Sequence, residues 1–156
     1  MSDIISSDLP FTAEQRATLE AVLPMVIPAS PDGLMPSAGE VGFLQWMDEF
    51  ARDAVDAIQI TLDRIDQAAR ESGGSAFAEL ETAGRQQVID GLFAGEPRTL
   101  RLLTDQVMAC YYSHERVLDA LGANPGPPFP HGNEVKQADL TLLDPVRERG
   151  KIWRDA

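Results

Sequence analysis

Apolar residues recur through most of the chain at the alternating three- and four-residue steps of an amphipathic helix. No segment shows the strict apolar–polar alternation that is typical of a half-buried strand. The pattern therefore predicts an all-α fold, with a compact bundle of about five to seven helices and a long irregular C-terminal tail. The clearest apolar stripe runs through Val55, Ile58, Leu62, Ile65 and Ala69.

Two capping boxes predict where helices begin. Thr12 is followed three residues later by Gln15, and Ser37 by Glu40, so each side chain of a pair can bond the backbone N–H group of the other residue. We therefore expect one helix to begin after Thr12 and a second helical region to begin after Ser37. Pro24 lies inside the first apolar run, where it is expected to kink the helix or end it early.

The second helical region has too many residues for one straight helix. An unbroken helix over residues 38–72 would be roughly 50 Å long, which is too long for a compact domain of this size. We therefore expect a break near Phe50–Asp53 and a stop at the Ser72–Ser75 turn. Further helices are expected from Thr82 to Gly95, from Pro97 onward, and from His114 to Leu121 with Ser113 as cap and Gly122 as stop.

The proline-rich segment after Ala123 is predicted to lack regular structure. Between residues 123 and 139 its only large apolar residues are Phe129 and Val135. Ordering each residue costs about 1–2 kcal/mol of backbone entropy, more than two buried side chains return. We therefore expect a polar arm (1–10), a helical domain (11–122) and an extended tail (123–156) with a short terminal helix from Asp144. The tail either joins that domain or docks on a partner.

The charge and the hydropathy of the chain limit its partners. A formal net charge of −12 disfavours nucleic acid and anionic membranes, and the simplest interpretation of the acids is a solvated surface. The longest apolar stretch, residues 22–29, is interrupted by prolines, so we expect no membrane span. The N-terminal residues lack the basic and apolar regions of a leader. We expect a cytoplasmic protein, or a periplasmic one if a partner with a leader carries it.

The residues of an active site are not recognisable. The sequence has no Gly-x-Gly-x-x-Gly motif, no Glu-x-x-His pair and a single cysteine, Cys110. Cys110 and His114 lie one helical turn apart, but Cys110 falls on an apolar stripe where an inert buried thiol is expected. His131 is interpreted as a loop or interface residue. We therefore predict no catalytic, cofactor-binding or metal-binding residue on this chain, although an enzyme using Cys110 or His131 stays an alternative.

Four segments, in this order, resemble the gluconate 2-dehydrogenase subunit 3 family. They read FTAEQRATLEAVLPMVIPAS, AFAELETAGRQQVIDGLFAG, YYSHERVLDALG and PPFPHGNEV…DPVRERGKIWR. The resemblance extends from Phe11 to Arg154. It implies a small helical, non-catalytic subunit that assists the folding, stability or export of a large FAD-dependent flavoprotein of the glucose–methanol–choline oxidoreductase type. Such a complex oxidises an alcohol group of a sugar or polyol, and many family members carry a twin-arginine leader, which this sequence lacks.

The residues expected to contact the partner lie near the end of the last long helix and in the tail. FAD is expected in the large subunit, and a cytochrome subunit is a further candidate partner. Cys110 is a candidate for an intermolecular disulfide if the complex is exported. The alternative function is that of a stand-alone acidic helical adaptor with an unrelated partner. The predicted contacts are Tyr112, Phe129, Pro130, His131 and Trp153.

Overall fold

The computed structural model describes residues 8–73, 75–123 and 138–150, and all the regular structure in them is helical. The predicted all-α fold is confirmed. The α-helices are α1 (Ala13–Val26), α2 (Phe43–Phe50), α3 (Val55–Glu71), α4 (Thr82–Gly95), α5 (Pro97–Ser113), α6 (Glu115–Ala120) and α7 (Asp144–Glu148). Short 3-10 turns occur at Ala38–Glu40, Arg52–Ala54, Phe77–Glu79 and Leu140–Leu143.

The capping box before α1 also connects this helix to α3. The Gln15 backbone N–H donates to Thr12 Oγ1 at 3.1 Å, and the Thr12 N–H donates to Gln15 Oε1 at 3.0 Å. Gln15 is buried, and its Nε2 donates to Asp63 Oδ1 on α3 at 2.9 Å. The predicted cap is therefore confirmed, and it fixes the position of α1 as well as its start. α1 continues through Pro24 and ends at Val26.

The second helical region is divided as predicted. The capping box of Ser37 and Glu40 is present, but it starts the 3-10 turn Ala38–Glu40 rather than an α-helix. α2 begins at Phe43 after Gly42, whose φ of +67° favours glycine, and a Cβ there would lie 2.5 Å from Gln45 Oε1. The break expected near Phe50–Asp53 is confirmed, because α2 ends at Phe50 and α3 begins at Val55.

The cap predicted for the short helix after α5 is wrong. His114, with an extended backbone, is the N-cap of α6, and its carbonyl oxygen accepts from the N–H groups of Val117 and Leu118. The Ser113 hydroxyl instead donates to the Cys110 carbonyl oxygen at 2.9 Å, one turn back on α5. The hydroxyl of a serine between two helices can hydrogen-bond to the backbone of either helix, and the Ser113 hydroxyl bonds to that of α5. The predicted stop at Gly122 is confirmed by its φ of +70°.

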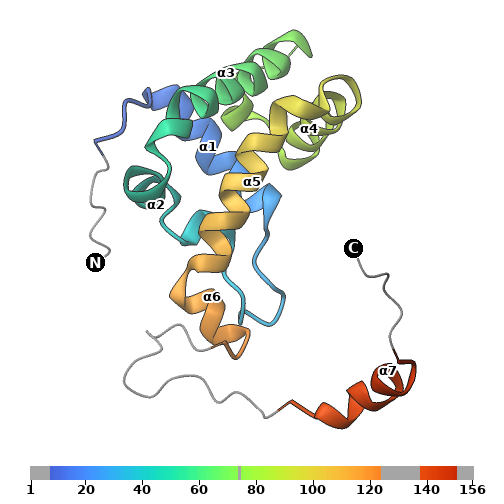
Figure 1. The fold of residues 1–156 in the computed structure, drawn as a ribbon. Helices are drawn as coiled ribbons and strands as arrows, with labels where there is room; N and C mark the ends of the chain where they lie inside the picture. Colours follow the sequence, from blue (N-terminus) through green and yellow to red (C-terminus); the bar gives the residue numbers. More distant parts are fainter. Residues whose placement is uncertain (1–7, 74, 124–137, 151–156) are drawn as a thin grey trace. The chain divides into compact units, whose positions relative to one another are not determined.

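α5 is the central helix of the fold. It contacts α1, α2, α3, α4 and α6, and Figure 1 shows it passing through the middle of these helices. Its apolar residues recur at helical spacing, so one stripe is buried along its whole length. The buried side chains of α5 are Leu100, Leu103, Val107, Cys110 and Tyr111.

The C-terminal part of α5 holds the irregular connection between α1 and α2. The Tyr111 side chain is fully buried, and its hydroxyl donates to the Pro36 carbonyl oxygen at 2.8 Å. Burial raises the pKa of the Tyr111 hydroxyl, which favours its protonated, hydrogen-bonding form. Cys110 Sγ donates to the Val41 carbonyl oxygen at 3.8 Å. Two adjacent residues of α5 thus bond backbone groups just before α2.

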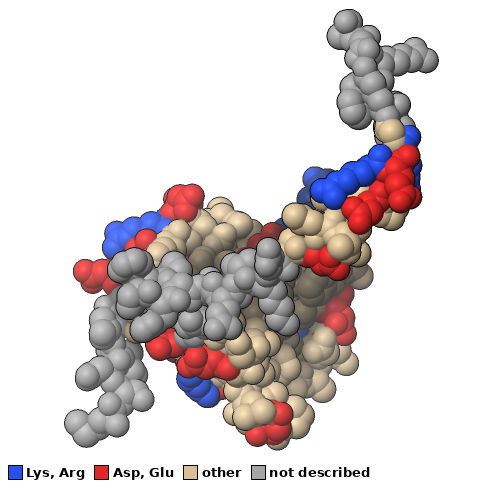
Figure 2. Space-filling view, turned by 60° about the horizontal axis from the view of Figure 1, so that its bottom comes forward, with Lys and Arg blue, Asp and Glu red and all other residues tan. Residues whose placement is uncertain are grey.

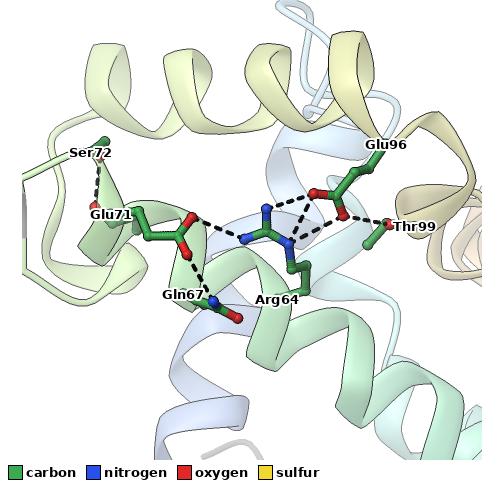
Figure 3. Close-up of polar contacts among 7 residues, drawn as sticks. Arg64, Gln67, Glu71, Ser72, Glu96 and Thr99 are labelled. Carbon is green, nitrogen blue, oxygen red and sulfur yellow. Dashed lines mark hydrogen bonds and ion pairs between the residues drawn. The ribbon is translucent and has the colours of Figure 1, made fainter.

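A polar cluster joins α3 to the junction of α4 and α5 (Figure 3). The Arg64 guanidinium on α3 donates to Glu96 through Nη2, at 2.6 Å, and through Nε, at 3.2 Å. It also reaches Glu71 at 3.4 Å, and the Thr99 hydroxyl donates to Glu96 at 3.3 Å. Glu96 directly precedes α5, so this cluster fixes where α5 starts relative to α3.

Two arginines form ion pairs with the aspartates four residues before them. Arg52 pairs with Asp48 on the surface. Arg70 Nε lies 2.7 Å from Asp66 Oδ2, but Asp66 is largely buried and its Oδ1 also accepts from the Phe77 N–H at 2.8 Å. The Asp66 carboxylate therefore bonds both to Arg70 on α3 and to the backbone of the turn that follows α3.

The chain divides into two units, residues 1–125 and residues 126–156. The first is called the helical body below. In the second, the described residues form the turn Leu140–Leu143 and α7, and the predicted helix start at Asp144 is confirmed. The assignment of an arm at 1–10 and a tail at 123–156 stays a prediction. Among the described residues, no helix is both long and apolar enough to cross a membrane.

Tyr111→Phe tests the hydrogen bond at the centre of the fold. The substitution leaves the Pro36 carbonyl oxygen without its donor, so the free energy of unfolding is expected to fall by about 1–2 kcal/mol. Tyr112→Phe is the matched control, because its ring is exposed, and its effect is expected to stay below about 0.5 kcal/mol. Urea unfolding measures both. Equal stabilities of the two variants would contradict the role of Tyr111.

Glu96→Gln tests the polar cluster through its pH dependence. Hydrogen bonds from Arg64 hold the pKa of the Glu96 carboxyl below its ordinary value of 4.5. The stabilisation is therefore complete above that value and is lost as the pH falls through the lowered pKa. We expect Glu96→Gln to have a lower melting temperature than the wild type at pH 7. The difference in melting temperature should become small near pH ~3. Glu20→Gln, at an exposed site, is the control. A difference that is constant with pH would contradict this account.

Candidate docking surface

An open groove of about 900 Å³ lies on the surface of the helical body. We call it the α2–α6 groove, because it lies between α2 and α6, with the end of α5 behind it. Its lining combines aromatic, acidic and small side chains. They come from Glu40–Gly42, from Gln45, Trp46, Glu49 and Phe50 on α2, from Ala109, Cys110 and Ser113 on α5, and from His114, Glu115, Arg116 and Asp119.

A row of aromatic rings leads from the core to the groove. Phe43 is buried, and its ring stacks on that of Trp46 with centroids 6.4 Å apart. The Trp46 ring in turn contacts the Phe50 ring at 6.0 Å. Phe50 is 65% exposed, which is high for a phenylalanine. α2 therefore buries Phe43 but leaves Phe50, on the same apolar face, exposed beside the groove.

The rim of the groove is mainly acidic. Arg116 is its single basic residue and lies 3.9 Å from Glu40. Hydrogen bonds from the Ser37 backbone and hydroxyl lower the pKa of the Glu40 carboxyl, so Glu40 stays ionised. The remaining rim carboxylates, Glu49, Glu115 and Asp119, form no ion pair within the part of the chain that the structure describes. Figure 2 shows acidic and basic side chains scattered over one face, with uncharged surface between them.

Cys110 and His114 both line the groove, but they are not arranged as a nucleophile and its base. Burial raises the pKa of the Cys110 thiol to about 12, so the thiolate is scarce at neutral pH. The thiol bonds the Val41 carbonyl oxygen instead of the imidazole. His114 Nδ1 is buried and has no hydrogen-bond partner among the described residues. The arrangement favours binding over covalent catalysis.

The residues predicted to contact a partner are only partly described. Tyr112 is 48% exposed on α5, and its ring packs edge-on against Tyr111 at 5.2 Å. It is not among the residues that line the groove, so it belongs to a different part of the surface. Cys110 is buried, and an intermolecular disulfide would require α5 to separate from Val41. The other predicted contacts, Phe129, Pro130, His131 and Trp153, lie outside the described residues.

The groove residues Trp46, Phe50 and Asp119 were not predicted from the sequence as site residues. The spacing of Phe43, Trp46 and Phe50, on a short helix that ends at Phe50, could have indicated an exposed aromatic surface. Such a short helix can bury only part of a broad apolar face. As to metals, residues 8–73, 75–123 and 138–150 contain no group of three or more His, Cys, Asp or Glu side chains that could hold an ion.

Comparison with known proteins gives one family. The family model described as gluconate 2-dehydrogenase subunit 3 matches residues 13–124, which cover the helical body from the start of α1 to just beyond α6. No curated protein and no solved structure matches the chain. The match includes the aromatic row of α2 and the whole lining of the groove.

Thiol labelling tests the buried state of Cys110. A pKa of about 12 lowers the thiolate fraction roughly a thousandfold relative to an ordinary cysteine. We expect the native protein at pH 8 to react with an aromatic disulfide reagent at least ~100-fold more slowly than the unfolded chain does. Cys110→Ser, which removes the only thiol, gives the background rate. Native and unfolded rates within a factor of about three of each other would contradict the buried thiol.

Proposed function

The chain belongs to the gluconate 2-dehydrogenase subunit 3 family, and from this premise we propose that it is the non-catalytic small subunit of an FAD-dependent dehydrogenase complex. In this proposal the large subunit is a flavoprotein of the glucose–methanol–choline type, which holds FAD and oxidises an alcohol group of a sugar or related substrate. The small subunit binds the flavoprotein and stabilises it, in the manner of a dedicated chaperone. Catalytic residues and FAD are assigned to the large subunit.

The observation that carries this proposal is the apolar surface of the second unit. Its described residues, 138–150, bury no side chain, and four large apolar ones are exposed within seven positions. An isolated helix needs about 12–15 residues to be marginally stable in water, and α7 with its preceding turn is shorter. A short apolar helix of this kind is stabilised when another surface covers it. The exposed residues are Leu140, Leu142, Leu143 and Val146.

The helical body contributes further exposed apolar side chains, which a large partner could cover. Tyr112 on α5 and Phe50 on α2 are both exposed, and both belong to residue types that are common at the centres of interfaces. We assign the tail residues Phe129, Pro130, His131 and Trp153 to the same interface. A cytochrome subunit is a further proposed partner. The complex is cytoplasmic in this proposal, or periplasmic if the large subunit carries the leader.

Co-expression with a glucose–methanol–choline type flavoprotein from the same genome tests the proposal. We expect a complex of fixed stoichiometry, with the absorbance of FAD in the complex and none in the small chain alone. Leu142→Ser should weaken the complex at least about tenfold, because it removes an exposed apolar contact. Leu34→Ser is the matched control, since Leu34 is an exposed leucine in a loop of the helical body. The affinity of this variant for the flavoprotein should stay within a factor of about two of the wild type.

Two results would contradict the proposed function. The first is a small chain that binds FAD on its own after purification. The second is a flavoprotein that is equally soluble and active with and without this chain and forms no complex with it. Recovery of an unrelated protein as the stable partner would favour the stand-alone adaptor instead.

A further inference from the structure

We propose that the α2–α6 groove is the part of the helical body that receives the large subunit, and that it binds an arginine carried on an apolar segment of that subunit. This inference rests on the proposed function and specifies one of its contacts. Two properties of the groove lead to it. The first is an exposed aromatic wall, and the second is a set of three rim carboxylates that form no ion pair with any described residue.

The aromatic wall requires an apolar partner. Phe50 is 65% exposed although its ring packs on Trp46, and the open groove beside these rings has a volume of about 900 Å³. Closure of the groove by a partner would remove these rings from water. Aromatic side chains that a partner can remove from water, surrounded by polar groups, are typical of an interface hot spot.

The rim carboxylates require a cationic partner. Arg116 faces Glu40, so Glu49, Glu115 and Asp119 are left without a basic residue within the described part of the chain. An anionic segment would meet repulsion from all of them. A second copy of this chain is also disfavoured, since it would bring the same net charge of −12 to the interface. A positively charged segment of the large subunit is the occupant that complements this rim.

Among cationic side chains, arginine fits the groove better than lysine. Its planar guanidinium stacks on an aromatic ring such as Trp46 and can donate two parallel hydrogen bonds to one carboxylate, such as that of Asp119. A lysine ammonium offers a point charge without this geometry. Trp46 on α2 and Asp119 on α6 both line the groove, so the lining offers an entering guanidinium both an aromatic ring and a carboxylate. The unpartnered His114 Nδ1 adds a buried polar atom to the same lining.

The test uses the full chain and the co-expressed flavoprotein. Asp119→Arg reverses a rim charge near the C-terminal end of α6, where a cation is compatible with the helix dipole, so the fold is expected to be kept. The dissociation constant of the complex should rise at least tenfold. Glu20→Arg is the matched control, because it makes the same charge reversal on an exposed position of α1 outside the groove, and it should change affinity less than threefold.

The identity of the partner side chain is tested by replacing the surface arginines of the large subunit one at a time with lysine. One such replacement should weaken binding to the wild-type chain at least fivefold and should weaken binding to Asp119→Asn much less. The inference is overturned if Asp119→Arg binds as tightly as Glu20→Arg, or if no arginine is coupled to Asp119. Absence of any complex with the wild-type chain overturns the proposed function and this inference together.

Discussion

The buried face of α5 is the constraint on which the rest of the structure depends. Because α5 contacts α1, α2, α3, α4 and α6, its apolar stripe is shared by the whole helical body. At its C-terminal end, Tyr111 and Cys110 bond the carbonyl oxygens of Pro36 and Val41. These bonds fix the irregular segment that leads into α2. α6 begins two residues after the C-terminal end of α5. Packing in the core therefore determines the shape of the groove on the surface.

The features that suggest a function all lie outside this core. The core is apolar, and two of its few buried polar side chains, Gln15 and Thr61, are hydrogen-bonded to neighbouring elements. By contrast, α2 leaves an aromatic row partly exposed, and the second unit leaves the apolar residues around α7 exposed. Both surfaces belong to a protein whose family is that of a dehydrogenase subunit. Exposed apolar groups on both units are expected of a chain that functions while covered by a larger partner.

The sequence predicted the helix ends better than the surfaces. Capping boxes, prolines and glycines act locally, so the starts at Thr12 and Pro97 and the stop at Gly122 followed from a few neighbouring residues. Ser113 was misassigned because its hydroxyl could serve either of two adjacent helices. The groove was missed for a different reason. The exposure of Phe50 depends on how α2 lies against α5, and the spacing of apolar residues gives no information on that orientation.

The central claim is that a large flavoprotein covers the apolar surfaces that the fold leaves exposed. Amide hydrogen exchange, measured by mass spectrometry on the free chain and on the flavoprotein complex, tests it most directly. The account predicts slower exchange in the complex for α2, α6 and residues 138–148, and unchanged exchange in the middle of α3, which is already buried in the free chain. Equal exchange of α2, α6 and residues 138–148 in both states would contradict it.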